Sequence, residues 1–303
     1  MDVLSDAIAA MRTGRPHSSL TSRRAPWGVR FDGGGHAGFH AVLEGHASLV
    51  LDGSDAEPLR LGPGDVVFLT HRGGYELVSG EGEGTGAGAG VSTVMICGAY
   101  LLDENRPHPL LSELPAVVHL PAASAASMGG AGGAGGGSVE AVLALLGAEL
   151  RVPQPGSDTV VTSLLDALLL LILRTWWLRV RGSTGDLTGW AAALADPAVA
   201  AALRAMHTDP AHSWTVGELG ALANLSRAPF ARRFTASVGT PPLAYLTWWR
   251  MTLAAGWLRD PDDVPLRSVA ERAGYASEFA FAKAFKREFK VAPGQYRKLR
   301  VAG

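Results

Sequence analysis

The segment LSRAPFARRF (residues 225–234) is followed 51 residues later by ASEFAFAKAF (residues 276–285). Both copies contain a serine, two phenylalanines four residues apart and a basic residue two positions after the first phenylalanine, Arg232 or Lys283. Two further alignments at this offset are Pro242 with Pro293 and Tyr245 with Tyr296. Such a repeat indicates a supersecondary unit that is present twice. Matches at a single offset argue against chance similarity within a generic helical bundle, and we interpret each unit as a helix-turn-helix.

Both copies carry signals for where their helices begin. Ser226 and Ser277 precede the second helices, and serine favours the N-cap position. In the first copy, Thr215 and Glu218 have the spacing of a capping box. The paired phenylalanines lie on one face of each second helix, which we expect to be buried.

The opposite face of each second helix is expected to contact DNA. Small residues allow close approach to base edges, and arginine or lysine can reach guanine or phosphate. A solvated basic face is the alternative for a single helix of this kind, but the duplication favours DNA. The predicted DNA-facing residues are Arg227, Ala228, Ala231 and Arg232 in the first copy and Glu278, Phe279, Ala282, Lys283 and Lys286 in the second.

The segment from Leu243 to Arg259 is predicted to form one helix between the two copies. About 16 residues at about 1.5 Å each span roughly 24 Å. This length suits two recognition helices in neighbouring major grooves about 34 Å apart, on a bent or locally deformed site.

Charge is divided unevenly along the 303 residues, a length typical of about two domains. From Asp196 onward there are 15 Lys and Arg against 9 Asp and Glu, a net charge of +6. The preceding residues have a net charge of −7. This asymmetry is typical of a phosphate-binding half joined to a sensing half.

Three further features predict a soluble, cytoplasmic protein with no membrane partner. The single cysteine, Cys97, excludes an internal disulfide and fits a reducing compartment. The N-terminus lacks the pattern of a signal peptide. The most apolar run, residues 164–173, is shorter than the roughly 20 residues that span a bilayer.

The first 121 residues are expected to form a β-sandwich or barrel. Short apolar runs alternate with glycine-rich turns, including Asp52-Gly53 and Gly62-Pro63-Gly64-Asp65. The predicted strands are residues 29–31, 39–43, 47–51, 59–61, 66–69, 75–78 and 91–96.

A Gly- and Ala-rich stretch, residues 122–138, is predicted to be a flexible linker. Two helices are expected in residues 139–189, and a DNA-binding domain in residues 190–303. The second of these helices, residues 158–180, is apolar over most of its circumference and must be covered from several sides. We expect it to form a homodimer interface; a core helix within one chain is the alternative.

Three stretches of the first half resemble the cupin-type sensor domain of AraC/XylS-family transcriptional regulators. They are residues 38–45, 61–69 and 97–100. The second half is similar to the DNA-binding domain of the same family, through residues 225–234, 242–251 and 269–297. Pro229, Phe279 and Lys283 depart from the family pattern, so its operator preference does not transfer.

The resemblance implies an α+β multidomain protein. A cupin-like β-barrel (a double-stranded β-helix) and linker or dimerisation helices would precede an all-α domain with two helix-turn-helix motifs joined by a long helix. The implied function is sequence-specific transcription regulation that reads two adjacent major grooves and responds to a small effector at the barrel. Double-stranded DNA and RNA polymerase are the implied partners, with no catalytic residues, metal or cofactor.

A metal-dependent cupin enzyme with an appended DNA-binding domain is an alternative. Imidazole and carboxylate ligands from His40, Glu44, His46 and His71 would suit iron, manganese or zinc. However, the first motif offers only His40 before Glu44, and Tyr75 takes the place of a second-motif histidine. We therefore expect His40, Glu44, His71 and Tyr75 to line an effector pocket instead.

Cys97 supports two hypotheses. A thiol in an apolar strand is usually a small buried hydrophobe. A thiol-based redox-sensing regulator would need a thiolate at this position. No second cysteine can resolve a sulfenic acid, and the structural role is the favoured one.

Overall fold

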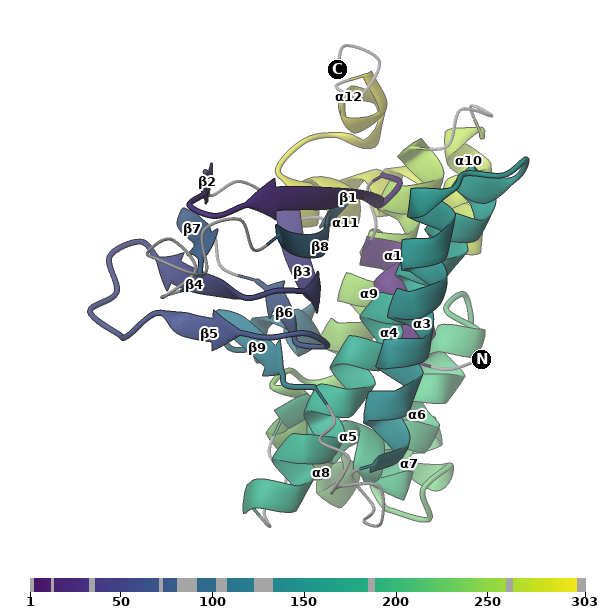
Figure 1. Ribbon diagram of the computed structural model, residues 1–303. Helices are drawn as coiled ribbons and strands as arrows, with labels where there is room; N and C mark the ends of the chain where they lie inside the picture. Colours follow the sequence, from purple (N-terminus) through teal and green to yellow (C-terminus); the bar gives the residue numbers. More distant parts are fainter. Residues whose placement is uncertain are drawn as a thin grey trace. The chain divides into compact units, whose positions relative to one another are not determined.

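The structure is a computed structural model of the 303-residue chain (Figure 1). It describes residues 3–11, 14–32, 36–70, 73–80, 92–101, 108–122, 133–184, 189–259 and 264–298. The chain divides into two compact units. The helical unit comprises Met1–Met11, His108–Leu110 and Leu187–Gly303, and the β-rich unit comprises Arg12–Pro107 and Leu111–Asp186.

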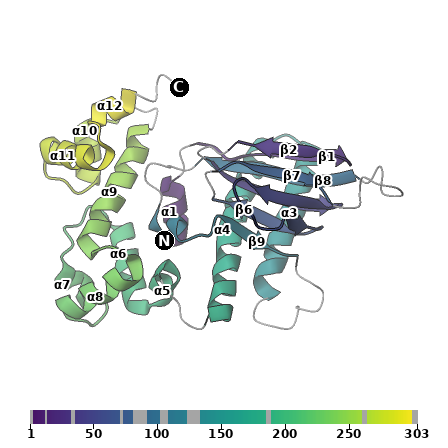
Figure 2. The ribbon, with the colours of Figure 1, turned by 90° about the vertical axis from the view of Figure 1, so that its left-hand side faces the viewer.

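The β-rich unit contains two antiparallel sheets (Figure 2). One sheet has the order β1-β8-β3-β6-β9, and the other has the order β2-β7-β4-β5. The strands are β1 (His17–Arg24), β2 (Gly28–Phe31), β3 (His36–Glu44), β4 (Ala47–Leu51), β5 (Leu59–Leu61), β6 (Val66–Leu69), β7 (Tyr75–Ser79), β8 (Ser92–Leu101) and β9 (Val117–Leu120). The seven predicted strands correspond to β2–β8. The burial pattern of β1 is irregular and mostly exposed, so apolar alternation could not reveal it.

The core of this unit lies between inward-facing side chains of both sheets. Its buried members are Val42, Ala47, Leu49, Leu61, Val67, Leu69, Tyr75, Leu77 and Met95. On the central strand β3, His40 is paired with Cys97 of β8 and with Val67 of β6.

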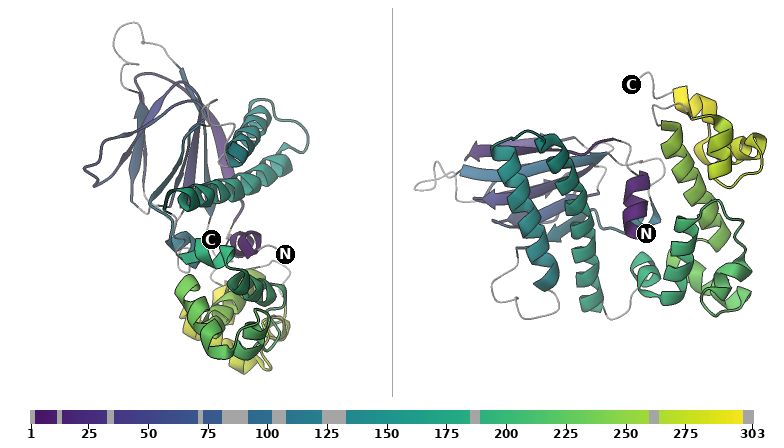
Figure 3. Two further views of the ribbon diagram at one scale, coloured as in Figure 1. Left: turned by 90° about the horizontal axis from the view of Figure 1, so that it is seen from below. Right: turned by 90° about the vertical axis from the view of Figure 1, so that its right-hand side faces the viewer.

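Two long helices, α3 (Gly133–Arg151) and α4 (Ser157–Thr184), pack together and lie along the five-stranded sheet (Figure 3). The hydroxyl of Tyr100 in β8 donates a hydrogen bond of 2.8 Å to the carbonyl of Leu165 in α4. A Cβ added at Gly147 of α3 would lie 3.4 Å from Leu43 and 3.8 Å from Ile96. Helix α3 therefore packs against the sheet at van der Waals distance around position 147.

The C-terminal end of the predicted linker, residues 122–138, is helical in the structure. Helix α3 begins at Gly133, six residues before the predicted start, because extending an existing helix costs far less than nucleating one. The rest of the predicted linker falls mainly in residues 123–132, outside the described residues. The part of α4 from Ser157 to Val180 is long and apolar enough, by length and composition, to cross a membrane, which residues 164–173 alone had not indicated. Only 33% of its apolar window is buried, so much of this helix is available to a partner.

The helical unit is built around α9 (Pro242–Arg259), an 18-residue helix about 27 Å long. Its other helices are α1 (Val3–Met11), α5 (Gly189–Ala195), α6 (Pro197–Thr208), α7 (Val216–Ala221), α8 (Arg227–Val238), α10 (Leu266–Arg272), α11 (Glu278–Phe289) and α12 (Pro293–Lys298). The short α2 (Pro109–Ser112) spans the division between the units.

Helix α1 belongs to this unit although it begins the chain. It packs against α6 and α9, and Val3, Leu4, Ala7 and Ile8 are buried. A carboxylate oxygen of Asp6 lies 3.5 Å from Nδ1 of His207. The other ring nitrogen of His207, Nε2, lies 2.7 Å from the hydroxyl of Tyr245. The helical unit is therefore not the continuous range 190–303 that the sequence predicts.

A second distant segment also enters the helical unit. His108 is fully buried, and its ring lies 4.7 Å from Trp190 and 5.0 Å from Trp248, centroid to centroid. Burial, together with the charge of His207, lowers the pKa of His108 to about 3. A neutral histidine among aromatic rings thus joins residues 108–110 to the helical core. The predicted sensor range, residues 1–121, contributes two segments to this core.

The backbone hydrogen bonds reproduce the sequence repeat. The amides of Phe230 and Gly239 bond four residues back, and so do those of Phe281 and Lys290. Around the turns, however, the matching bonds are 50 residues apart, as for Leu225 to Gly220 and Tyr275 to Ala270. The second copy therefore has one extra residue between turn and recognition helix, which falls at Ala276.

The ends of the recognition helices give a prediction about stability. Gly239 ends α8 and Lys290 ends α11, both in the left-handed conformation with φ of 79° and 64°. Glycine adopts this conformation without the steric cost that lysine pays. We expect Lys290→Gly to raise the free energy of unfolding by about 1 kcal/mol and Gly239→Ala to lower it by a similar amount. Urea denaturation of the full chain measures both; equal midpoints for Lys290→Gly and wild type would contradict the prediction.

Candidate nucleic-acid interface and effector site

The first helix-turn-helix consists of α7 and α8. The predicted capping box is present, since the Thr215 hydroxyl accepts from the Glu218 amide and the Glu218 carboxylate accepts from the Thr215 amide. The two helices approach closely at Gly220, where a Cβ would lie 2.8 Å from the carbonyl oxygen of Leu225. Ser226 occupies the N-cap of α8, but its side chain makes no capping hydrogen bond, which corrects the expectation for this residue.

The second helix-turn-helix consists of α10 and α11. The Ser277 hydroxyl accepts a hydrogen bond of 3.2 Å from the Ala280 amide, so this predicted cap is present. In both motifs the paired phenylalanines are fully buried, at Phe230 and Phe234 and at Phe281 and Phe285. The shared residues of the repeat thus form the scaffold that holds the recognition helices.

The predicted DNA-facing residues lie on the outward faces of α8 and α11. Arg227, Ala228, Arg232, Glu278, Phe279, Lys283 and Lys286 are exposed, and Ala231 and Ala282 are half-buried. Phe279 is 80% exposed, which is unusual for a large apolar side chain. Each face thus presents small residues and cations, and α11 adds an aromatic ring.

One arginine of α8 has a different role from its neighbour. Arg233 donates a hydrogen bond to the carboxylate of Asp196, which also caps α6 by accepting from the amides of Ala198 and Val199. Burial alone would raise the pKa of the Asp196 carboxyl group, but these hydrogen bonds hold this pKa below its usual value. Arg233 therefore fastens α8 to α6, a contact that the spacing of the repeat does not predict.

In the β-rich unit the structure brings two of the predicted effector residues together. Nε2 of His40 lies 2.8 Å from the hydroxyl of Tyr75, and both side chains are buried. The ring of Phe31 stacks on Tyr75 at 4.8 Å and lies 4.9 Å from His40. Among the described residues, Nδ1 of His40 has no hydrogen-bond partner. A buried imidazole with one satisfied nitrogen therefore faces the space between the sheets.

This pair is uncharged at neutral pH. Burial lowers the pKa of His40 to about 4, and burial with the nearby thiol of Cys97 raises the pKa of Tyr75. The His40–Tyr75 pair can therefore donate or accept hydrogen bonds but offers no counter-charge to an ionised ligand.

Glu44 does not join His40 and Tyr75. The register of β3 against β8 shifts between Val42 and Glu44, a bulge that breaks the alternation of the strand. The Glu44 carboxylate is exposed and lies 3.3 Å from Arg151 of α3. Placing Glu44 in the pocket was therefore wrong. His71 lies outside the described residues.

Two other residues occupy separate places. His46 lines a surface cavity of about 270 Å³ with Ser48 and Arg60. Burial raises the pKa of the Cys97 thiol to about 11, although a contact with Thr21 at 3.9 Å and the charge of Arg23 oppose the shift. In the part of the chain that the structure describes, no three His, Cys, Asp or Glu residues are grouped to hold a metal ion.

The burial of His40 gives a pH prediction. Its pKa is about 4 in the folded chain and about 6.5 when unfolded, so the unfolded state takes up a proton first as the pH falls. The free energy of unfolding of the β-rich unit should be highest above pH 6.5 and should decrease by about 3 kcal/mol as the pH falls towards 4. Urea midpoints between pH 7 and 4.5 measure this loss. His40→Gln, which keeps a hydrogen-bonding group but does not titrate, should show a flatter profile; identical slopes would contradict the prediction.

A double-sheet unit joined to tandem helix-turn-helix motifs is the arrangement of a DNA-binding regulator with a sensor domain. The model of the Cupin family matches residues 2–177, and that of the helix-turn-helix domain family matches residues 219–299. The chain belongs to the family of AraC-like transcription regulators.

Three relatives illustrate the similarity. A putative AraC-like transcription regulator from Streptomyces antibioticus is 37% identical and covers 98% of this chain and 99% of its own length. One from Streptomyces lividans is 35% identical, covering 98% of each chain. The RCS-specific HTH-type transcriptional activator RclR of Escherichia coli K12 is 31% identical over 86% of this chain and 83% of its own.

Proposed function

We propose that this protein is a sequence-specific transcription regulator that binds double-stranded DNA with both recognition helices. The observation that carries the proposal is the contrast within the repeat: buried positions are shared, whereas the exposed faces of α8 and α11 differ. Arg232 lies on a face with Ala228 and Ala231, while Lys283 lies on a face with Phe279 and Glu278. The two motifs would therefore recognise different bases.

The roles on DNA follow from side-chain chemistry. Arg232 would reach guanine O6 and N7, with Ala228 and Ala231 allowing the helix backbone close to the bases. In the second motif, Phe279 would contact a thymine methyl group or a sugar, and Lys283 a base or phosphate. The remaining predicted contacts, Arg227, Glu278, Ala282 and Lys286, border these positions.

The His40–Tyr75 pair supports an effector site inside the β-rich unit. Its neutral hydrogen-bonding groups and the adjacent Phe31 ring favour a small uncharged effector with one polar atom near Nδ1 of His40. This role is regulatory and not enzymatic. Because the Cys97 thiol stays protonated at neutral pH, effector binding is favoured over thiol oxidation as the signal.

The exposed part of α4 supports a homodimer. Val160, Leu164, Leu171 and Leu178 are spaced by four, seven and seven residues, so they share one stripe of the helix. Val160 and Leu178 are 42% and 43% exposed. A second copy of the same stripe would cover them. Such a dimer would act in the cytoplasm on chromosomal DNA, with RNA polymerase as a further partner.

Substitution within this stripe tests the dimer. Wild type should sediment as a dimer at micromolar concentration, and Leu171→Glu should sediment as a monomer because it places a charge in an apolar interface. Val152→Glu is the matched control, since Val152 is 63% exposed but lies after α3, off the stripe. A monomeric wild type, or a dimeric Leu171→Glu, would overturn the proposed interface.

Selection from random DNA tests the function itself. The full chain should enrich one asymmetric site that contains two different half-sites. Binding to that site should exceed binding to unrelated DNA by at least about 1000-fold at physiological salt. Enrichment of no sequence would refute the proposal.

A further inference from the structure

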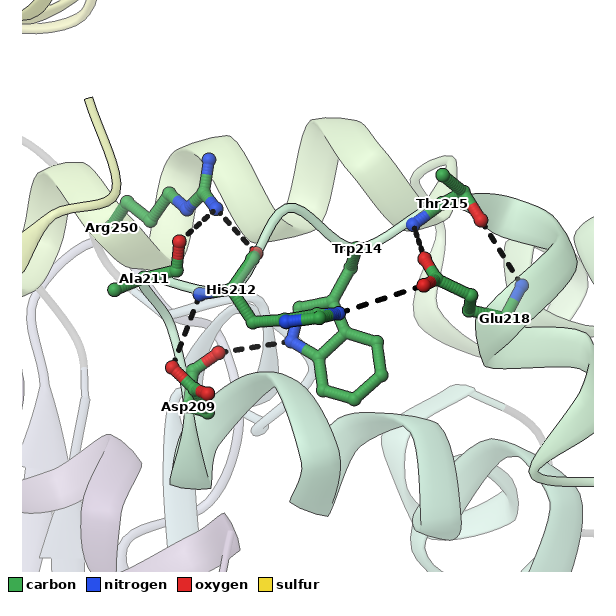
Figure 4. A network of polar contacts seen from close by, with 7 residues as sticks. All are labelled: Asp209, Ala211, His212, Trp214, Thr215, Glu218 and Arg250. Carbon is green, nitrogen blue, oxygen red and sulfur yellow. Dashed lines mark hydrogen bonds and ion pairs between the residues drawn. The ribbon is translucent and has the colours of Figure 1, made fainter. Parts of the chain in front are cut away.

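Loop 209–214, which leads from α6 into the first helix-turn-helix, has a fixed shape. The carboxylate of Asp209 accepts from the amide of His212 at 3.1 Å, and its carbonyl accepts from the indole of Trp214 at 2.9 Å. His212 lies edge-on to Trp214, at 4.3 Å between ring centroids. Its Nε2 is also 3.6 Å from Glu218, which completes the capping box of α7 (Figure 4). The loop is thereby fastened to the start of the first motif.

A single arginine of the linking helix α9 holds this loop. Nε of Arg250 donates to the carbonyl of Pro210 at 2.6 Å. Nη2 donates to the carbonyls of His212 at 2.8 Å and Ala211 at 3.5 Å (Figure 4). The guanidinium group presents several donors in a rigid fork, which a lysine ammonium cannot reproduce. Three consecutive carbonyls therefore converge on one side chain.

The second helix-turn-helix also meets this guanidinium group. The guanidinium carbon lies 6.0 Å from the ring centroid of Tyr275, in the turn between α10 and α11. A Cβ added at Gly274 would lie 2.6 Å from the carbonyl oxygen of Ala211 and 2.8 Å from Nη2 of Arg250. The turn of the second motif therefore packs directly on the loop that leads into the first.

We propose that Arg250 is a positioning residue that fixes the two helix-turn-helix motifs relative to each other and so sets the spacing between half-sites that the protein accepts. The proposal rests on the function proposed above and adds its geometric control. Arg250 contacts both loop 209–214 and Tyr275. Without this side chain, the two motifs would be connected here only by the backbone of α9. Without the guanidinium group, each motif keeps its own core but loses this fixed contact with the other.

Binding to DNA with altered spacing tests the proposal. On the selected site, inserting five base pairs between the half-sites should weaken wild-type binding by at least about 30-fold, because it rotates one half-site by about half a helical turn. Arg250→Ala should bind a single half-site with an affinity within about twofold of wild type. Its affinity for the intact site should be about tenfold lower than that of wild type. Inserting the five base pairs should weaken its binding by less than about threefold. Arg204→Ala, an exposed arginine of α6, should behave as wild type. An Arg250→Ala variant with the full insertion penalty would overturn the proposal.

A second measurement does not depend on DNA. Spin labels at Ala236→Cys on α8 and Lys286→Cys on α11, in a Cys97→Ser background, report the distance between the recognition helices in the full chain. Wild type should give a narrow distribution, and Arg250→Lys, which retains the charge and should fold, a clearly broader one. An unchanged distribution would overturn the proposal. Failure of wild type to bind DNA would refute the proposed function, while the label distances would still decide the role of Arg250.

Discussion

Replacing Arg232 with glutamate is expected to weaken binding to the selected DNA site by at least about 100-fold. A bidentate arginine–guanine contact contributes about 1–3 kcal/mol, and the substituted carboxylate would also face phosphates. A 100-fold change corresponds to about 2.8 kcal/mol. The fold should be unaffected because Arg232 is exposed, and titration at constant salt concentration measures the change.

The matched control is Arg204→Glu, which makes the same change of charge in the same unit. Arg204 is exposed on α6, outside both helix-turn-helix motifs. Its substitution should change affinity by less than about fivefold, through long-range electrostatics alone. Equal losses for the two variants would mean that Arg232 contributes only net charge and does not read a base.

Phe279 and Phe281 lie two residues apart on α11, and we expect opposite consequences when each becomes alanine. Phe281 is fully buried, and Phe281→Ala should lower the free energy of unfolding by about 3–5 kcal/mol through lost burial and a cavity. Phe279 is 80% exposed, so Phe279→Ala should change that free energy by less than about 0.5 kcal/mol.

The same two variants should also differ in how they lose DNA binding. Phe279→Ala should fold normally and lose roughly tenfold in specific affinity, about 1.4 kcal/mol, with preference relaxed at one base pair. Phe281→Ala should lose binding in proportion to the fraction unfolded. Urea denaturation together with DNA titration distinguishes them. A Phe279→Ala variant with wild-type affinity and specificity would exclude this ring from the interface.

The scaffold of the second half was predictable from sequence because its determinants are local. Caps, the phenylalanine pairs and the repeat itself identify both motifs without long-range information. The extra residue at Ala276 was hidden, since an alignment at one offset cannot show where a turn lengthens. Both Ser226 and Ser277 were expected to cap their helices. Ser277 makes its capping hydrogen bond, but Ser226 does not.

Long-range features were not predictable in the same way. The burial of α1 and His108 in the helical unit depends on contacts across most of the chain, and nothing local in residues 1–121 indicates it. For the effector site, Glu44 was expected beside His40, but the bulge after Val42 breaks the alternation of β3 and Glu44 is exposed. His40 and Tyr75 were both expected to line an effector pocket, but their direct contact and their neutral state follow only from the structure.

The most direct test of the central claim is a footprint of the full chain on its selected site. Two tandem recognition helices predict two protected major-groove segments on one face of the DNA, about 10 base pairs apart centre to centre. Arg232→Glu should remove protection from one segment and Lys283→Glu from the other. Wild-type protection of a single segment, or loss of both segments equally in each variant, would contradict the assignment of one motif to each half-site.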